Sequence, residues 1–385
     1  MAKKRVLIFY DHFPPAFKAG GPVQSLVNLV RTCSNHYAFF LICKPHEMGS
    51  SVPLPGIAAD TWTNWEDKAQ VMYRRYGSHA TLPLQALLNQ VQPDVVYING
   101  LFSWHFNIQP LWAALRYQKK HTGLQVIVAA RGMLHPGALS QKGLKKQIFL
   151  RLLRWLGWHR RIRWHATDAV ESHCIQQQFG SRVHVKVAGN FPNLFAVAPY
   201  PPKQKGVLKM ATIALISPMK NHFEVVKALP HVQAAITWYI YGPVKDAAYW
   251  KACEAAIAEL PATIQVRYCG AVAPADLPAI LQQFQLLIMP SKSENFGHAI
   301  VEALSAGKPV LTTTTTPFGQ LEQQGAGKAL PPDALEEQLP AALQYFADLD
   351  DAQWQQASQR ATSFAAAFVQ LPQLQQQYHQ LFETP

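Results

Sequence analysis

The chain has 385 residues and a mass of 43.0 kDa; 49% of its residues are hydrophobic and 15% are charged. This length suits two or three domains, and the apolar share is large enough for buried cores. Disordered chains, collagen-like chains and small disulfide scaffolds are therefore excluded. The formal net charge of +12 at pH 7 makes the protein basic.

The charge is divided unevenly along the chain. Residues 1–200 hold 23 Lys and Arg against 8 Asp and Glu, whereas residues 201–385 hold 12 against 15. No acidic residue lies between Asp94 and Asp168, and this stretch carries twelve Lys and Arg from Arg116 to Arg163. A basic surface of this kind attracts anionic lipid headgroups, phosphorylated substrates or nucleic acid. Nucleic acid is disfavoured, because no recognised binding motif accompanies the charge.

Short apolar runs alternate with longer amphipathic ones, which is typical of repeated β-α units around parallel sheets. In chain order, the strands expected in the first half are 5–10, 38–43, 95–98, 125–129, 164–166 and 184–187. Those expected in the second half are 210–216, 237–241, 264–268, 285–289 and 309–313. Two doubly wound sheets fit this count better than one.

The domain boundary is expected at a stretch rich in Pro and polar residues, 196–206, where the charge also changes sign. The pattern thus predicts one Rossmann-like domain over 1–195, a linker over 196–206 and a second such domain over 207–365. A terminal helix is expected over 366–385. Open α/β domains bind ligands beyond the carboxyl ends of their strands, and helix N-termini there favour anions.

The cysteines and the first residues favour the cytoplasm. Five cysteines are scattered without a Cys-x-x-Cys pair or a His/Cys metal spacing, as in a reducing compartment. The basic start is followed by an apolar run that stops at Asp11, too short for a signal peptide, so we expect a first buried strand. No apolar run approaches the roughly 18 to 20 residues of a membrane span. Any membrane association would be peripheral.

The densest motif occupies residues 290–310 and reads Pro-Ser-Lys-Ser-Glu-Asn-Phe-Gly-His-Ala-Ile-Val-Glu-Ala-Leu-Ser-Ala-Gly-Lys-Pro-Val. It predicts a strand end, a loop, a helix over 298–306 and a buried strand. The N–H groups of Phe296, Gly297 and His298 would point at a ligand in front of the helix, and Gly297 would let it come close. Glu294 lies in the loop and Glu302 lies inside the helix. The alternative is a capped surface helix with two ordinary glutamates.

This motif resembles the signature of the retaining glycosyltransferases of family 4, also called glycosyl transferases group 1. That family has the GT-B fold, two facing Rossmann-like domains with a C-terminal crossover helix. The resemblance implies that the helix over 366–385 packs back on the first domain. Seven further segments resemble loops of the family and occur in its order: 13–22, 99–104, 130–133, 166–171, 191–193, 241–243 and 316–318. The resemblance implies that the first domain binds the acceptor and the second binds a nucleoside-diphosphate sugar.

The resemblance also implies roles for the motif residues. Glu302 would accept hydrogen bonds from the ribose, and Glu294 would contact the transferred sugar as a catalytic residue. The donor would also be bound by Asn295, Phe296, Gly297 and His298. In the family, backbone amides and basic side chains stabilise the leaving diphosphate, so no metal or cofactor besides the donor is expected. We interpret the one Asp-x-Asp sequence, 348–350, as helix capping.

The loop after the first strand of the second domain departs from the family. Relatives have Arg four or five residues before Lys there, whereas this chain keeps Lys220 but has Leu215 at the Arg position. Either Lys220 holds the diphosphate together with a basic residue from elsewhere, or donor binding is weakened. The alternative role for Lys220 is that of a solvated loop residue.

Two loops of the first domain are further candidates. Gly20 and Gly21 precede a helix with Pro at its first turn, so its N–H groups could meet the diphosphate; an ordinary βα turn is the alternative. Arg131 follows the strand over 125–129 and is assigned a contact to sugar or phosphate. Some relatives have an important His near this point, but we do not assign His135 as a base.

The acid-free stretch contains a basic amphipathic segment, 142–163. Its apolar residues share one helical face: Leu144, Ile148, Leu152, Trp155 and Leu156. Such a cationic, aromatic helix suits binding to an anionic membrane surface. The alternative is a helix whose apolar face lies in the core while its basic face is solvated. Both interpretations stay open at this point.

The sequence thus predicts a retaining, metal-independent hexosyltransferase. Its donor would be a nucleoside-diphosphate sugar, with a UDP-sugar favoured, and its acceptor a glycan or glycolipid in bacterial cell-surface polysaccharide synthesis. The protein would be cytoplasmic, either free or peripheral on the inner membrane face. One alternative is a nucleotide-sugar epimerase on the same fold. The other is a non-catalytic membrane-surface binding protein, which the departure at Leu215 leaves open.

Overall fold

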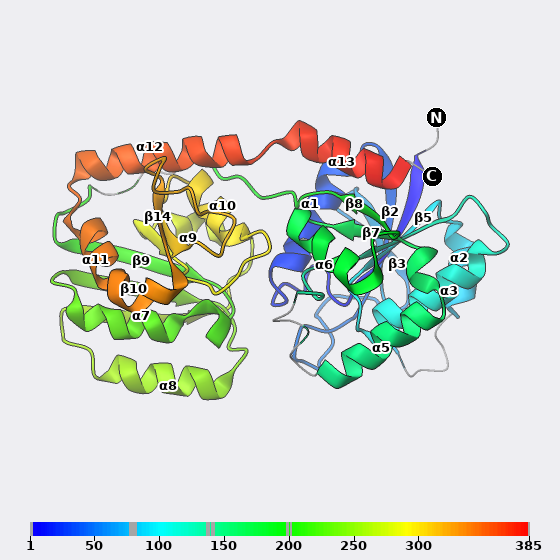
Figure 1. Ribbon diagram of the computed structural model, residues 1–385, viewed down its shortest axis with the longest axis horizontal. Helices are drawn as coiled ribbons and strands as arrows, with labels where there is room; N and C mark the ends of the chain where they lie inside the picture. Colours follow the sequence, from blue (N-terminus) through cyan, green and yellow to red (C-terminus); the bar gives the residue numbers. More distant parts are fainter. Residues whose placement is uncertain are drawn as a thin grey trace. The chain divides into compact units, whose positions relative to one another are not determined.

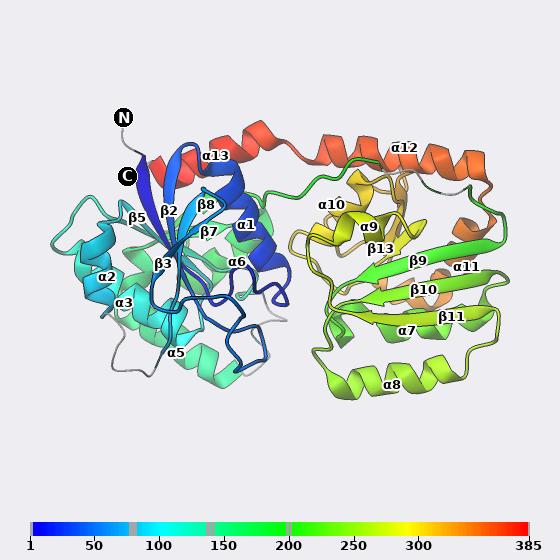
Figure 2. The same cartoon turned by 180° about the vertical axis from the view of Figure 1, so that it is seen from behind.

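A computed structural model describes residues 3–76, 83–135, 139, 143–197, 200 and 202–383. The chain divides into two compact units, the first formed by Met1–Phe191 with Leu371–Pro385 and the second by Pro192–Gln370. Each unit is a twisted, mainly parallel sheet with helices on both faces (Figures 1 and 2). The predicted pair of doubly wound sheets is confirmed.

The first unit contains an eight-stranded sheet of order β3-β4-β2-β1-β5-β6-β7-β8, in which only the β3-β4 pair is antiparallel. The strands are β1 Lys4–Phe9, β2 Tyr37–Cys43, β3 Trp62–Trp65, β4 Ala69–Tyr73, β5 Val95–Asn99, β6 Gln125–Ala129, β7 Arg163–Ala166 and β8 His184–Val187. Its helices are α1 Gly21–Cys33, α2 Leu84–Val91, η1 Trp104–Ile108, α3 Gln109–Gln118, α5 Gly143–Trp155, η2 Trp158–Arg160, α6 Ala169–Phe179 and α13 Leu371–Glu383.

The second unit contains a six-stranded parallel sheet of order β11-β10-β9-β12-β13-β14. The strands are β9 Val207–Ile213, β10 Ala235–Tyr241, β11 Ile264–Gly270, β12 Leu286–Ile288, β13 Val310–Thr313 and β14 Gly327–Leu330. The helices are η3 Pro218–Lys220, α7 His222–Ala228, η4 Leu229–His231, α8 Ala247–Ala258, α9 Leu277–Leu281, α10 His298–Ser305, η5 Pro332–Ala334, α11 Leu335–Asp348 and α12 Asp351–Phe368.

Each sheet separates two apolar cores. In the second unit, Met210 of β9 packs into a core with α7, α8 and α11, whereas its neighbour Ala211 faces a core with α9, α10 and α12. In the first unit, α2, α3, α5 and α6 cover one face and α1 and α13 cover the other. The central strands are buried on both faces, which is why their sequences read as continuous apolar runs rather than alternating ones.

The chain passes between the units at Phe191/Pro192 and returns at Gln370/Leu371. The first crossing lies before the predicted linker 196–206. Residues on both sides of the start of that stretch already bind the second unit: Phe195 N donates to Ser305 Oγ at 3.0 Å, and Lys203 Nζ donates to the carbonyl oxygen of Ala347 near the end of α11. Residues 198–199 and 201 of that linker lie outside the described residues. After the return, Tyr378, Leu381 and Phe382 of α13 are fully buried in the first unit.

Several element bounds differ from the predicted ones. The strand expected at 210–216 is β9 over 207–213, so its start and end were each placed three residues late. Three strands were missed, β3, β4 and β14. Asp350 caps α12 in a capping box with Gln353, and its carboxylate accepts a hydrogen bond from Gln353 N at 2.9 Å. The interpretation of the Asp-x-Asp sequence, 348–350, as helix capping is confirmed.

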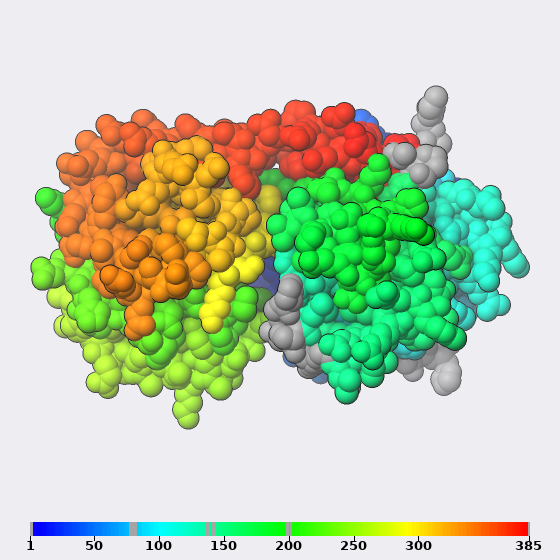
Figure 3. Space-filling model, viewed as in Figure 1, coloured from blue at the N-terminus to red at the C-terminus, as the bar shows by residue number. Residues whose placement is uncertain are grey.

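The apolar face predicted for the 142–163 segment is not in the core. The interpretation of this segment as a helix with that face buried is therefore wrong. Residue 142 lies outside the described residues. Leu150 and Leu153, each 1% exposed, anchor α5 instead. The predicted apolar face turns outward: Leu144, Ile148, Leu152, Trp155 and Leu156 are 74, 56, 47, 81 and 39% exposed. This helix lies at the surface of the first unit (Figures 1 and 3).

The lysine that binds the end of α11 provides a stability test. Lys203 is 4% exposed, and its Nζ donates to the carbonyl oxygens of Gln204, Ala347 and Leu349 at 2.7, 2.8 and 3.1 Å. Lys203→Met leaves these acceptors without their donor, so we expect the free energy of unfolding to fall by about 1–3 kcal/mol in urea denaturation. The control is Lys205→Met at an exposed position. Equal stability of the two variants would contradict the role of Lys203.

Candidate functional site

The order of the second sheet locates a candidate site. β9 and β12 are parallel neighbours at the centre, and the chain leaves them in opposite directions, toward β10 and toward β13. Open α/β sheets bind ligands beyond the carboxyl ends of strands at such a switch point. The loop after β9 carries Lys220, and the loop after β12 carries Glu294. Both predicted residues therefore follow strand ends at the switch point.

Two hydrogen bonds join these loops. Asn221 Nδ2 donates to the carbonyl oxygen of Pro290 at 2.8 Å, and Lys292 N donates to the carbonyl oxygen of Met219 at 2.9 Å. Asn221 is buried and has a left-handed backbone with φ of 53°, a conformation that Asn adopts more readily than most residues. The bonds place the side chains of the two loops side by side.

Lys220 and Glu294 form an ion pair between Nζ and Oε1. Their side chains are only 18 and 12% exposed, so solvent screens the pair less than a surface pair. The structure thus brings together two predicted site residues that are 74 positions apart in the sequence. The pair offers an ammonium for an anionic ligand and a carboxylate for hydroxyl groups or a developing positive charge.

The N-terminus of α10 adds fixed partial charge to this site. Gly297 precedes the helix with φ of 74°, and no side chain caps it among the described residues. A Cβ at Gly297 would lie 2.8 Å from Phe318, whose ring is fully buried, so Gly is required both by conformation and by space. The N–H groups of the first turn favour a negative charge in front of the helix. This agrees with the geometry expected from the sequence.

The remaining predicted residues of the loop lie beside this helix start. Asn295, Phe296 and His298 are half-buried. The rings of Phe296 and His298 are 4.7 Å apart between centroids, and Phe296 also contacts Phe368 of α12 at 6.1 Å. The loop is therefore supported by the long helix behind it. Contact of these residues with a donor stays a prediction.

Glu302 lies deeper, inside α10. It is 5% exposed, and its Oε1 accepts a hydrogen bond from Asn193 Nδ2 at 3.2 Å. Burial raises the pKa of Glu302 to about 7, and the bond from Asn193 opposes part of this increase. Asn193 was not assigned a role from the sequence, although segment 191–193 was noted as a family-like loop. The carboxylate is placed to accept further hydrogen bonds, and its contact with ribose stays a prediction.

Gly20 and Gly21 belong to the first unit, at the start of α1 after β1. Gly20 has φ of 73°, and a Cβ there would meet nothing within 4 Å, so its backbone conformation rather than crowding favours Gly. The loop before it is held by Glu47, whose carboxylate accepts from Phe17 N and Lys18 N at 3.0 and 3.1 Å. No side chain caps α1 among the described residues, so N–H groups of its first turn can face a ligand, except at Pro22, which has none.

Arg131 also belongs to the first unit, where its guanidinium is bound on three sides. Nε donates to Asn99 Oδ1 at 2.6 Å, Nη1 to Asn190 Oδ1 at 2.6 Å and Nη2 to the hydroxyl of Tyr97 at 3.0 Å. This network joins the ends of β5 and β6 to the segment after β8. Sequence reasoning did not foresee it, because its members are far apart in the chain. A contact of Arg131 with sugar or phosphate stays a prediction.

The turn at Arg131 is supported by a buried carboxylate. Glu171 is fully buried and accepts from Gly132 N, from Thr167 N at 2.7 Å and from Thr167 Oγ1 at 2.9 Å. Asp168 meanwhile caps α6 by accepting from Glu171 N at 2.7 Å. The family-like segment 166–171 therefore has a structural role, which is to hold the loop after β6.

Burial of Glu302 predicts a pH dependence of stability. Its pKa is about 7 in the folded protein against an ordinary value of 4.5, so its stabilising contribution is complete below pH 4.5 and is lost as pH rises to 7. Glu302→Gln keeps an acceptor for Asn193 without the charge. We expect the variant to gain stability over wild type across this window, by up to about 3 kcal/mol, in denaturation curves from pH 4.5 to 8. The control is the exposed Glu254→Gln; parallel pH curves for wild type and Glu302→Gln would contradict the prediction.

Comparisons with known proteins agree with this geometry. Residues 199–362 match the family model of the glycosyl transferases group 1. No match was found among curated proteins.

Among solved structures, sucrose-phosphate synthase from Thermosynechococcus elongatus is 14% identical, with a TM-score of 0.74 and coverage of 99% of this chain and 98% of that one. HepE from Anabaena in complex with UDP-glucose is 16% identical, with a TM-score of 0.69 and 98% coverage of both chains. WaaG, a glycosyltransferase involved in lipopolysaccharide biosynthesis, is 13% identical, with a TM-score of 0.63 and coverage of 99 and 100%. The chain therefore has the GT-B fold, and the region that matches the glycosyl transferases group 1 model lies within its second unit.

Proposed function

We propose that the protein is a retaining glycosyltransferase that transfers a sugar from a UDP-sugar to a glycan or lipid-linked acceptor in bacterial cell-surface polysaccharide synthesis. The observation that carries the proposal is the Lys220–Glu294 pair in front of α10, inside the matched domain. HepE, which is similar in structure, forms complexes with UDP and with UDP-glucose, and WaaG is involved in lipopolysaccharide biosynthesis. These two proteins support a nucleotide-sugar donor and a cell-surface glycan product.

In the proposed reaction, the bond between the anomeric carbon and the diphosphate oxygen breaks and a bond to an acceptor hydroxyl oxygen forms on the same face. The proton of the acceptor hydroxyl passes to the departing diphosphate oxygen, and UDP leaves with the bonding electron pair. Negative charge grows on the diphosphate, where Lys220 and the N-terminus of α10 would stabilise it. Positive charge grows on the sugar ring, where Glu294 would stabilise it. Before the donor binds, each of these two side chains neutralises the other.

We further propose that transfer needs no metal ion, since an ammonium and a helix N-terminus supply positive charge at fixed positions. Leu215 occupies the position where relatives have Arg, so Lys220 would be the main side-chain cation for the diphosphate. Removal of divalent ions by a chelator is therefore expected to leave the transfer rate unchanged. A rate that falls with the chelator and recovers with Mg²⁺ or Mn²⁺ would contradict this part of the proposal.

The roles of the ion pair can be separated by two substitutions. Glu294→Gln should lower the rate of sugar transfer or donor hydrolysis about 100-fold or more while UDP still stabilises the protein against heat. Lys220→Met should weaken UDP binding about 10- to 100-fold, because a charge-assisted contact to the diphosphate is lost. The measurements are UDP release from a panel of UDP-sugars and thermal shift with UDP.

The control for both substitutions is Lys292→Met, because Lys292 is exposed in the same loop and, among the residues that the structure describes, forms no side-chain hydrogen bond or ion pair. An unchanged rate in Glu294→Gln would overturn the transferase assignment. Conversion of the donor to a different UDP-sugar without an acceptor, with solvent deuterium incorporated, would show an epimerase instead.

We propose that α5 holds the enzyme at an anionic membrane surface, where a lipid-linked acceptor would lie. Four large apolar side chains of this helix are more than 45% exposed, and Lys145, Arg151 and Arg154 are exposed beside them. An outward apolar face with basic flanks matches the interface of a bilayer with anionic lipids in both hydrophobicity and charge. Among the described residues, no helix has the length and hydropathy to cross a membrane.

The membrane proposal is tested by sedimentation with vesicles. Binding is expected for vesicles with about 30% anionic phospholipid, to weaken with salt, and to be absent for neutral vesicles. The double variant Leu152→Glu/Trp155→Glu should lose binding, since both side chains are exposed and their replacement leaves the core intact. Val170→Glu, at a 62% exposed position on α6, is the control. Equal binding by both variants would exclude α5 as the contact surface.

A further inference from the structure

A basic cavity lies in the first unit, at the edge of the sheet where its parallel strands begin. A cavity of about 550 Å³ opens between the first residues of four strands, the loop after α3, residues 160–162 and the end of α13. The four strand-starting residues in its lining are Lys4, Gln125, Arg163 and His184. The candidate nucleotide-sugar site follows strand carboxyl ends in the other unit, so this cavity is a separate site.

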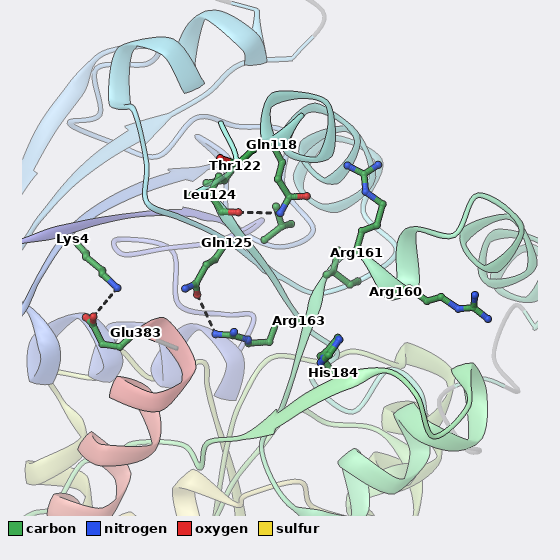
Figure 4. Close-up of a pocket in the computed structure, with 13 residues that line it drawn as sticks. Lys4, Gln118, Thr122, Leu124, Gln125, Arg160, Arg161, Arg163, His184 and Glu383 are labelled. Atoms are coloured by element: carbon green, nitrogen blue, oxygen red, sulfur yellow. Dashed lines mark hydrogen bonds and ion pairs between the residues drawn. The ribbon is translucent and has the colours of Figure 1, made fainter. Parts of the chain in front are cut away.

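The charge of the lining is strongly positive. Its charged residues are four cations and one carboxylate: Lys4, Arg160, Arg161, Arg163 and Glu383. Glu383 is already paired with Lys4 at 2.6 Å. The three arginines form no ion pair among the described residues, so their charges have no protein counter-ion there. Figure 4 shows the Lys4–Glu383 pair on one side, the side chains of Gln125 and Arg163 meeting at the centre, and Arg161 on the other side.

The hydrogen bonds of the arginines leave donors for a ligand. Arg163 Nη1 donates to Gln125 Oε1 at 3.1 Å and to the carbonyl oxygen of Leu381 at 2.8 Å, both neutral acceptors. Arg161 Nη2 donates to the carbonyl oxygen of Leu115 at 2.9 Å. These contacts fix the direction of the two guanidinium groups without neutralising them. Partial burial lowers the pKa of Arg163, so an anion in the cavity would relieve a real desolvation cost.

We infer that this cavity binds a phosphorylated small molecule or headgroup through Arg160, Arg161 and Arg163. Guanidinium groups bind phosphate oxygens through paired N–H donors, and several of them around one cavity select a ligand with two or more negative charges. The volume suits a ligand of the size of a phosphorylated sugar rather than a single ion. The inference does not rest on the proposed transferase function, because no residue of the Lys220–Glu294 site takes part.

The test uses calorimetric titration of the full chain with inorganic pyrophosphate. The Lys220→Met background is used to weaken any binding of pyrophosphate at the candidate donor site. One binding event is expected, and its affinity should fall with added salt. In this background, Arg160→Gln/Arg161→Gln should weaken binding at least about tenfold, since two charge-assisted contacts are lost. Arg182→Gln, exposed and outside the cavity, should bind like the background.

A second arm identifies the source of the phosphate. Monomeric short-chain phosphatidic acid is titrated into the same proteins below its aggregation concentration. Binding of pyrophosphate alone assigns the site to a free phosphorylated molecule, whereas tighter binding of the phosphatidic acid assigns it to a lipid headgroup. The inference is overturned if neither probe binds, or if the Arg160→Gln/Arg161→Gln protein binds as well as the Arg182→Gln protein. Arg163→Gln provides a further check, with circular dichroism to confirm folding.

Discussion

The candidate site depends on the pairing of β9 with β12. Because these two strands are parallel neighbours, the loops that follow them must leave the sheet at the same edge. Lys220 and Glu294, far apart in the sequence, are brought to the same edge for this reason, and two hydrogen bonds between their loops hold them close together. The start of α10 follows in the same loop, so a cation, a carboxylate and a helix N-terminus are assembled by one strand pair.

Much of the architecture could be predicted from the sequence, because central parallel strands are apolar on both faces. The bounds of β6 and β8 were predicted to the residue, as was the start of α10. The missed strands are of a different kind. β3 is only four residues long and reads Trp-Thr-Asn-Trp, and β4 is buried but only five residues long. β14 reads Gly-Lys-Ala-Leu, with too little apolar character to be distinguished from a loop. Such short segments give only a weak hydrophobic pattern.

The candidate site shows the same division between local and long-range information. The helix start at Gly297 is encoded locally by glycine and the preceding loop, and the sequence suffices to predict it. The hydrogen bonds of Arg131 to Asn99 and Asn190, and that of Glu302 to Asn193, join segments that only the folded chain brings together. The outward face of α5 was ambiguous for a related reason. Leu150 and Leu153 supply a second apolar stripe, and periodicity alone cannot say which stripe faces the core.

The return of the chain to the first unit has a consequence for its biosynthesis. Tyr378, Leu381 and Phe382 of α13 complete a core that also contains Tyr37 and Phe191, although the whole second unit lies between them in the sequence. On the ribosome, domains usually fold in order from the N-terminus. Here the first unit cannot close its core until α13 has emerged, after the second unit has been synthesised. The unit translated first is therefore completed last, and its apolar face stays uncovered during that interval.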